Sequence, residues 1–460
     1  MEGLETQEKS LSEVLNNKDF RIDSSFYTKE PKKNPNLIYA KIGEHLILSQ
    51  YGISIEMNTD SIGYPIYRMN EIHDMLCDLD VDKCADITET EYNKFALKDG
   101  DVLFNRTNSF EWVGRTGIYY QNDDIQRTFA SYLVRLNPKE SILPEYLCAY
   151  LNCKYGKWDI KRRARQSINQ TNVNPEEVKE IEIPILNIDL QQKIQDCFTR
   201  ANSLRVLSKT TYSEAELILH EELDIDLSVM VSTTVTQKRF SDFVNSGRLD
   251  AEYYRPKYDD LFSRLSKFET KRLGEIVRIR KSIEPGSDAY QNKGIPFMRV
   301  SNLSKFGFSD TEIHLSPDEY RDSVRPKQNT ILLSKDGSVG IAYKVEQDMD
   351  VITSGAILHL AITDDEFMPD YLTLVLNSVI VGMQAERDAG GSIIQHWKPS
   401  EIENVIIPKL SQEFQQEITN KVRESFALRD ESKRLLNLAK TAIEIAIEQG
   451  ENAAMNLLNI

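Results

Sequence analysis

The chain has 460 residues, of which 40% are hydrophobic and 28% charged, as in an ordinary soluble protein with room for two or three domains. Its formal net charge of −16 argues against a uniformly basic nucleic-acid binder, and its five cysteines include no Cys-x-x-Cys pair of the kind that zinc sites use. The N-terminus MEGLETQEKS has no basic segment followed by an apolar one, so we expect no signal peptide and a cytoplasmic protein.

After a short N-terminal extension at residues 1–10, residues 11–187 alternate brief apolar runs with turn residues. The stretch LFNRTNSFEWVGRTGI at 103–118 places a polar loop between two such runs, which is typical of strands in a mixed α+β domain. A helix is expected after LPEY, with Pro144 in its first turn. The basic run KYGKWDIKRRAR at 154–165 indicates either a nucleic-acid contact or a solvated helix face.

Residues 188–236 are expected to form a long helix followed by a linker. Apolar residues recur near helical spacing and form a stripe that another element must cover. Ser208 and Thr211 interrupt this stripe. The residues predicted to pack are Leu190, Ile194, Phe198 and Leu204.

Residues 237–411 repeat residues 11–187 at an offset of about 225, so the chain is two copies of one unit. In order, the matching segments are LSEVLNNKDFRID with FSDFVNSGRLD, GYPIYRMNEI with GIPFMRVSNL, LPEYLCAYLN with MPDYLTLVLN, QSINQ with GSIIQ, and NPEEVKEIEIPIL with KPSEIENVIIPKL. The loop at 103–118 lies over LLSKDGSVGIAYKV at 332–345, with Gly114 over Gly340. Prolines, glycines and apolar positions repeat, whereas the polar loop residues differ, as expected of one scaffold that carries two different binding sites.

The second copy departs from the first in two places. The segment NSVIVGMQAERDAGG shows no counterpart of the Arg-rich run. The apolar run at 371–383 is too short, and too polar at Asn377, to span a bilayer.

Residues 412–460 are expected to form the second long helix, from about Gln412 to Gln449, with Gly450 as its stop. Ser425 and Ser432 interrupt its apolar stripe. Two independent amphipathic helices are one interpretation, but we favour an antiparallel coiled coil, because neither stripe has another obvious partner. The residues predicted to pack are Phe414, Ile418, Val422, Leu428 and Leu435.

Motifs for catalysis are missing from the sequence. It has no Gly-x-x-x-x-Gly-Lys loop, no His-Glu-x-x-His and no Gly-x-Gly-x-x-Gly after a strand. Its six histidines are scattered, and His359, within AILHLAI, is interpreted as a structural residue. A catalyst built on an unrecognised geometry remains an alternative, because active sites are defined spatially and not by sequence spacing.

In this order and in duplicate, LFNRTNSFEWVGRTG, LLSKDGSVGIAY, QSINQ, GSIIQ, IPIL, IPKL, QQKI and QQEI closely resemble the specificity (S) subunits of type I restriction–modification systems. The resemblance covers the chain after its first ten residues. It implies two target-recognition domains, at 11–187 and 237–411, held apart by two antiparallel helices with a pseudo-two-fold relation. It also implies that the chain is not an enzyme and that it reads a split, asymmetric target in double-stranded DNA.

The partners that the resemblance implies are two modification (adenine methyltransferase) subunits and, where present, restriction subunits, with no membrane. No cofactor and no metal are expected on this chain, because S-adenosylmethionine, ATP and Mg are expected on the partners. Polar and basic loop residues suit phosphate and base-edge contacts. The first-copy candidates are Asn105, Arg106, Thr107, Asn108, Arg115, Arg162, Arg163, Arg165 and Gln166. The second-copy candidates are Arg299, Ser301, Asn302, Lys335, Asp336, Ser338, Gln395 and Lys398.

Three alternatives stay open at this point. The chain could serve a related system whose methyltransferase and nuclease share one polypeptide. It could be an enzyme whose motifs are disguised, or an adaptor that binds proteins through its two loop-bearing domains. Several of the singled-out residues have a structural alternative as well, because Gly114, Gly340, Gln170 and Gln395 suit turns and Arg162 suits a helix surface.

Overall fold

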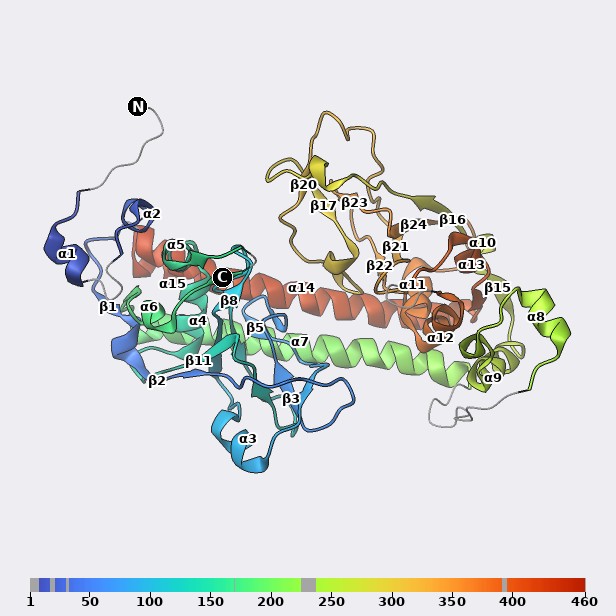
Figure 1. Cartoon of the computed structure of the whole chain (residues 1–460), viewed down its shortest axis with the longest axis horizontal. Coiled ribbons are helices and arrows are strands. Elements are labelled where there is room, and N and C mark those ends of the chain that lie inside the picture. Colours follow the sequence, from blue (N-terminus) through green and yellow to red (C-terminus); the bar gives the residue numbers. More distant parts are fainter. Residues whose placement is uncertain are drawn as a thin grey trace. The chain divides into compact units, whose positions relative to one another are not determined.

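The computed structural model describes residues 8–16, 21–29, 33–168, 170–224, 237–390 and 395–459. Contacts divide the chain into two compact units: unit 1 is Met1–Leu207 with Leu428–Ile460, and unit 2 is Ser208–Ala427. Each unit takes part of helix α7 (Ile188–Glu222) and part of helix α14 (Gln412–Gln449), the two longest helices of Figure 1. Residues 225–236, the end of the segment predicted at 188–236 as a helix and linker, lie outside the described residues, as do residues 391–394, most of GSIIQ.

Unit 1 contains fourteen strands among its described residues. They are β1 (Tyr39–Lys41), β2 (Leu46–Tyr51), β3 (Tyr64–Tyr67), β4 (Ile72–His73), β5 (Leu76–Cys77), β6 (Cys84–Ala85), β7 (Asp101–Asn105), β8 (Thr107–Asn108), β9 (Thr116–Tyr119), β10 (Thr128–Phe129), β11 (Leu133–Pro138), β12 (Arg165–Gln166), β13 (Thr171–Asn172) and β14 (Glu182–Pro184). Its short helices are α1 (Leu11–Asn16), α2 (Ser24–Thr28), η1 (Ile42–His45), α3 (Glu89–Phe95), α4 (Pro144–Asn152), α5 (Lys154–Arg163), α6 (Pro175–Lys179) and α15 (Glu451–Leu458).

Unit 2 follows the same plan with fewer strands. They are β15 (Thr270–Arg272), β16 (Val277–Lys281), β17 (Ile295–Met298), β18 (Leu303–Ser304), β19 (Gly307–Phe308), β20 (His314–Leu315), β21 (Ile331–Ser334), β22 (Ala342–Lys344), β23 (Ile352–Thr353), β24 (Ile357–Ile362) and β25 (Ile406–Pro408). Its short helices are α8 (Phe240–Ser246), η3 (Ala251–Tyr254), α9 (Pro256–Leu265), α10 (Leu273–Ile276), η4 (Ser287–Ala289), η5 (Val300–Asn302), α11 (Pro369–Asn377), α12 (Val379–Asp388) and α13 (Pro399–Glu403).

The sheets confirm the predicted repeat of a mixed α+β unit. The order β2-β11-β7-β9 in unit 1 corresponds to β16-β24-β21-β22 in unit 2, and all of these pairs are antiparallel. A second sheet pairs β3 with β10 in parallel, and its counterpart pairs β17 with β23 in parallel. The pair β1–β14 corresponds to β15–β25. Each strand in these pairings therefore has one counterpart in the other unit.

The central strands read as continuous apolar runs because both of their faces are buried. In unit 1, Val102 and Phe104 join the core formed with α4, whereas Leu103 joins a separate cluster with Phe129. In unit 2, Ile331 and Leu333 face the α11 core and Leu332 faces another cluster. The period of two along a strand produces this division.

Helices α4 and α11 begin at Pro144 and Pro369, as predicted for proline at the first helical position. The apolar run at 371–383 is divided between the buried helices α11 and α12. Across the described parts of the chain, no helix combines the length and the apolar character that a bilayer span requires.

Helices α7 and α14 pack on each other within each unit, as predicted. In unit 1, Leu190, Ile194 and Phe198 join one core with Leu435, while Leu204 packs against that core. In unit 2, Ile418 and Val422 are buried with α7 residues, and Phe414 packs against the same cluster. Leu428 is half-buried. Helix α14 ends at Gln449, where Gly450 has φ 96°.

The serines that appeared to interrupt the stripe bind across the helix pair. In unit 1, the Ser432 hydroxyl donates to the Ala201 carbonyl at 2.7 Å. In unit 2, the Ser425 hydroxyl donates to the Ser208 carbonyl at 2.7 Å, and the two hydroxyl oxygens lie 3.0 Å apart. Also in unit 2, Glu214 pairs with Lys421, so a later residue of α7 meets an earlier residue of α14. The helices are therefore antiparallel there, and small polar residues allow them to approach closely.

A buried glutamine connects each long helix to its domain. Gln191 accepts from the Leu143 backbone N–H through Oε1 and donates from Nε2 to the Leu186 carbonyl, both at 2.9 Å. Gln415 makes the equivalent two bonds in unit 2, both at 3.0 Å. The first glutamine of the repeated QQKI and QQEI motifs thus has a structural role, which is to bond the long helix to its domain.

We predict that Gln415→Ala lowers the free energy of unfolding by about 2–3 kcal/mol, because it leaves buried backbone groups without partners. Urea denaturation followed by circular dichroism measures the change. The matched control is Gln416→Ala, which alters an exposed side chain bonded only to Asn420 among the described residues, so a change within about 0.5 kcal/mol is expected. Equal effects of the two substitutions would contradict the assignment.

His359 is a structural group, as interpreted from the sequence. It lies in β24 with 3% of its surface exposed, and its Nε2 is 2.7 Å from Thr353 Oγ1. Burial, aided by the charge of Arg280, lowers the pKa of His359 to about 4 from 6.5. The folded chain therefore keeps this imidazole neutral where an unfolded chain protonates it.

We predict a loss of about 2 kcal/mol of stability from this group between pH 7 and pH 5, because the unfolded state then binds a proton that the folded state does not. This contribution is complete above pH 6.5 and is lost as the pH falls towards 4. Denaturation of wild type and His359→Gln at both pH values measures it, since the variant should lose less stability on acidification. Replacing the half-buried His314 provides the control, and an unchanged pH dependence in His359→Gln would refute the prediction.

Candidate nucleic-acid interface

In unit 1, two candidate segments distant in sequence meet in one small sheet of order β12-β13-β8. Arg165 and Gln166 in β12 pair with Asn172 and Thr171 in β13. The same β13 residues pair on their other side with Thr107 and Asn108 of β8, respectively. The polar segment after β7 and the start of QSINQ therefore belong to one small sheet.

A glycine closes the loop that leads into this sheet. The Asn105 backbone N–H donates to the Arg115 carbonyl at 2.8 Å, and the Gly114 backbone N–H donates to the Asn105 carbonyl at 2.7 Å. Gly114 has φ 90°, and a Cβ there would lie 2.5 Å from Ile160 Cγ2. Gly340 has φ 89° and donates to the Ser334 carbonyl in the same way at 2.9 Å. The aligned glycines thus have one conformational role in both units.

Unit 2 builds the equivalent surface with different side chains. The Gly337 N–H donates to the Gln395 carbonyl at 3.0 Å, and Asp336 forms a β-bridge with His396. The imidazole Nδ1 of His396 lies 2.8 Å from an Asp336 carboxylate oxygen. At the equivalent place in unit 1, the Thr107 hydroxyl donates to Asn172 at 2.5 Å. A neutral pair in one unit therefore corresponds to an ionisable pair in the other.

Sequence reasoning missed Asn172 and His396. Both follow the repeated QSINQ and GSIIQ turns within two residues, so alignment of the two copies past these motifs would have found them. Their roles depend on strand register, because each pairs with a loop residue about 60 positions away. The sequence alone does not supply that register.

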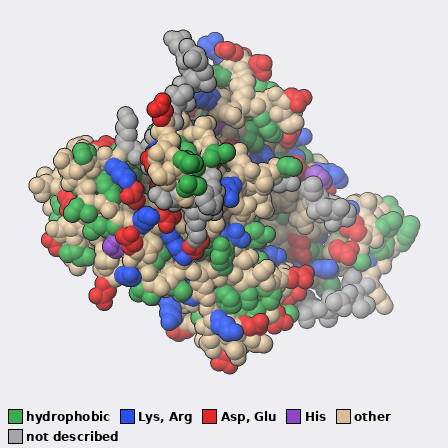
Figure 2. Space-filling view, turned by 60° about the vertical axis from the view of Figure 1, so that its left-hand side comes forward, with side chains coloured by type: hydrophobic (Ala, Val, Ile, Leu, Met, Phe, Trp, Pro, Cys, Tyr) green, Lys and Arg blue, Asp and Glu red, His purple; other side chains and the backbone are tan. Residues whose placement is uncertain are grey.

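The remaining candidates differ widely in exposure. Those exposed to solvent are Arg165, Gln166, Arg299, Ser301, Ser338, Gln395 and Lys398. Those that are half-buried are Arg106, Asn108, Arg115, Asn302, Lys335 and Asp336. Those that are buried are Asn105, Thr107, Arg162 and Arg163. Figure 2 shows Lys and Arg side chains mixed with Asp and Glu over the face in view.

Three unit 2 candidates belong to a separate turn at η5. The Arg299 backbone N–H donates to Asn302 Oδ1 at 3.1 Å, and the equivalent Arg68 N–H donates to Glu71 Oε2 at 2.7 Å. In unit 1 the Glu71 carboxylate also pairs with the Arg68 guanidinium. Asn302 is neutral, so this turn leaves Arg299 with a different electrostatic environment.

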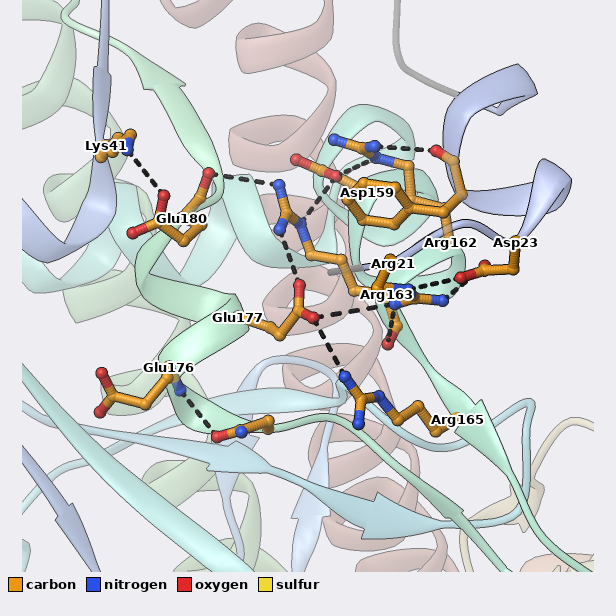
Figure 3. Close-up of polar contacts among 12 residues, drawn as sticks. Arg21, Asp23, Lys41, Asp159, Arg162, Arg163, Arg165, Glu176, Glu177 and Glu180 are labelled. Carbon is orange, nitrogen blue, oxygen red and sulfur yellow. Dashed lines mark hydrogen bonds and ion pairs between the residues drawn. The ribbon is translucent and has the colours of Figure 1, made fainter. Parts of the chain in front are cut away.

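The structure corrects the prediction that Arg162 and Arg163 lie on a DNA-binding or solvated face (Figure 3). Their exposed fractions are 9% and 6%, and both pair with Asp159. Arg163 also pairs with Glu177 at 3.0 Å, and Arg162 donates to the Phe26 carbonyl at 2.9 Å. Their guanidinium groups are satisfied inside the unit, so we remove both from the candidate interface.

This network attaches the N-terminal segment to α5 and recurs in unit 2. Arg21 pairs with Asp23 at 2.7 Å and donates to the Arg163 carbonyl at 3.0 Å. Arg248 pairs with Asp250 at 2.7 Å and donates to the Asp388 carbonyl at 3.1 Å. Hydrogen bonding from Arg248 lowers the pKa of the Asp250 carboxyl. The repeated Arg-x-Asp sequences thus mark a docking contact.

One arginine of the second copy has the aromatic contact that Arg162 has in unit 1, although the Arg-rich run itself is not repeated. The Arg387 guanidinium lies 5.0 Å from the Tyr253 ring centroid, as Arg162 lies 4.5 Å from that of Phe26. The sequence comparison missed this because a single arginine has replaced the basic run.

Metal-ligating groups are not gathered at this surface. Across the described ranges, no cluster of three or more His, Cys, Asp or Glu side chains is arranged to hold a metal ion. The five cysteines are free and buried. What this surface offers chemically is hydrogen bonding and positive charge.

The family model for the type I restriction modification DNA specificity domain matches residues 7–217 and 266–430 of the chain. The chain belongs to this family. The two matches confirm the resemblance drawn from the sequence.

Two relatives of the chain carry the name of specificity subunits. The chain is 31% identical over 144 residues to the putative type I restriction enzyme MjaX specificity subunit of Methanocaldococcus jannaschii, covering 31% of this chain and 34% of that protein. It is 24% identical over 145 residues to the EcoKI specificity subunit of Escherichia coli, covering 31% of each chain. These alignments thus span about a third of either relative.

A comparison with solved structures also gives a match along most of the chain. The S subunit of a type I restriction–modification system from M. genitalium is 14% identical, and the match covers 93% of this chain and 97% of that chain with a TM-score of 0.35.

We predict that Arg163→Gln lowers the free energy of unfolding of this specificity-domain protein by about 3 kcal/mol, because it leaves two buried carboxylates undercompensated. Urea denaturation measures the stability, and hydrogen exchange of residues 21–29 should rise as their docking site weakens. Arg165→Gln is the control: its side chain is 53% exposed and 3.6 Å from Glu177, so less than about 1 kcal/mol is expected. A larger effect for Arg165→Gln would contradict this interpretation.

Proposed function

We propose that this chain is the DNA-recognition subunit of a type I restriction–modification complex and that its two units read the two halves of a split, asymmetric target. The observation that carries the proposal is that each unit builds the same small surface from equivalent backbone pairings. The same backbone bonds hold Asn108 opposite Thr171 and Gly337 opposite Gln395, yet the side chains around them differ. One scaffold with two sets of contact groups suits two different half-sites.

The exposed candidates suit both parts of such recognition. Arg165 and Lys398 are cations at the surface, the kind of group that positions a protein on phosphates. Gln166, Ser338 and Gln395 carry donors and acceptors that match base edges in the major groove. In this proposal residues 11–187 and 237–411 are the target-recognition domains.

The partners in this proposal follow from the division of labour. Two modification subunits bind S-adenosylmethionine and methylate adenines, and restriction subunits, where present, use ATP and Mg. The chain itself supplies recognition and catalyses nothing. It acts in the cytoplasm, where the DNA is.

We predict that deleting the gene removes N6-methyladenine from one split, asymmetric motif in the host genome. Long-read sequencing of the intact and deleted strains measures this and gives both half-sites and their spacer. If the map does not change, the gene is expressed with its neighbouring methyltransferase in a host without the system. Failure to create a new methylated motif there would refute the proposal.

Substitutions on one surface provide the matched control. Gln166→Ala with Arg165→Ala should weaken or relax one half-site, whereas Ser338→Ala with Gln395→Ala should affect the other. If both pairs altered the same half-site, the assignment of one unit to each half would be wrong.

A further inference from the structure

Arg106 in unit 1 has a fixed backbone at the surface that we propose reads DNA. It follows β7 directly, and its N–H donates to the Tyr132 carbonyl at 3.0 Å. Its own carbonyl accepts from Val173 N–H at 2.9 Å. Arg106 thus lies between β11 and β13, next to the paired residues of the β12-β13-β8 sheet.

The guanidinium of Arg106 is held from two sides. Its Nε donates to the Ser131 carbonyl at 3.0 Å, and its carbon lies 5.0 Å from the Tyr51 ring centroid. Tyr51 ends the edge strand β2 and is 47% exposed, so its ring supports the guanidinium at the surface. Among the residues that the structure describes, the two terminal nitrogens have no hydrogen-bond partner and no carboxylate. The geometry is that of a planar fork with its outer edge available.

Two other arginines of unit 1 differ from Arg106 in being paired with carboxylates. Arg68 pairs with Glu71 and Arg135 with Asp101. The contrast extends to unit 2. There, the equivalent cation, Lys335, pairs with Asp336, and strand register places Lys281 where unit 1 has Tyr51. The aromatic-supported fork is therefore specific to unit 1.

We propose that Arg106 reads a guanine in the half-site of unit 1 and that Tyr51 is its positioning residue. The outer edge of a guanidinium donates two parallel hydrogen bonds to guanine N7 and O6 in the major groove. Fixing Nε and the face of the group beforehand restricts the fork to one plane, which favours a base edge over the freely rotating geometry of a phosphate contact. This inference rests on the proposed function and identifies one base that it reads.

The test uses the chain assembled with its methyltransferase subunits and selected against DNA with a randomised target. Wild type should require guanine at one position of one half-site. Arg106→Ala should reduce that preference by roughly 5- to 150-fold at this position alone, because a bidentate pair gives discrimination of that order. Replacing this guanine by 7-deazaguanine should weaken binding by wild type and leave Arg106→Ala unaffected.

Further variants separate reading from folding and from charge. Arg106→Lys keeps the charge and should still lose the preference. Tyr51→Ala should reduce it and Tyr51→Phe should keep it, since the ring and not the hydroxyl supports the fork. Lys335→Ala is the matched control and should leave this half-site unchanged. Equal thermal stability of the Arg106 variants and wild type excludes misfolding.

Two results would overturn the inference. If Arg106→Ala weakens binding to all sequences alike and lowers its salt dependence, Arg106 contacts a phosphate. If the preference at every position survives in Arg106→Ala, the residue reads nothing. Both outcomes leave the proposed function intact, whereas a wild-type complex without any sequence preference would overturn the proposed function together with this inference.

Discussion

The packing of α7 against α14 is the constraint on which each unit depends. Unit 1 closes its core with α14 residues such as Ala439, Ala442 and Ala446, which come more than 200 positions after α7. Unit 2 closes its core with Tyr212, Ala215 and Leu219 of α7. Unit 1 is built from two separate stretches of sequence, and the core of unit 2 joins the two ends of its single stretch, so loss of the helix pair would expose apolar surface in both units.

Polar contacts give this packing its register. An apolar stripe tolerates sliding by a turn, but the Ser432–Ala201 and Ser425–Ser208 bonds each form in one alignment only. Gln191 and Gln415 then connect the helices to the strands and short helices that carry the loops. A buried hydrogen bond contributes little net stability but costs more when unmade, which makes it a means of selecting one arrangement. The positions of the loop surfaces thus derive from a few buried polar groups.

The sequence predicted the repeated framework well because that framework has local signals. Proline at the starts of α4 and α11, the aligned Gly114 and Gly340, and the apolar stripes of α7 and α14 all depend on short-range patterns. The α14 bounds agree with expectation for the same reason.

The contents of the interface were less predictable, since they depend on partners that are distant in sequence. From sequence, Arg162 belongs to a basic run that is expected to be solvated. In the fold it bonds to Phe26, which lies 136 positions away in the sequence. Conversely, Tyr51 and His396 carry no local sign of function. Only the folded structure singles them out, because it places Tyr51 beside the guanidinium of Arg106 and His396 beside the carboxylate of Asp336. Amino-acid composition gives the number of charged side chains but not which basic side chains are paired with carboxylates in the fold.

That distinction reconciles the net charge of −16 with the DNA-reading surface that we propose. Many of its basic side chains are bound to carboxylates of the same unit and contribute to folding: Arg163 to Glu177, Arg135 to Asp101 and Lys344 to Asp370. Among the described residues, Arg106 is a cation that the fold holds in place without a carboxylate, so its charge remains available for a ligand. Recognition then depends on the position and orientation of a cation such as Arg106 rather than on the sum of charges. Two units with one scaffold can therefore differ in specificity through the neutralisation of a single equivalent residue.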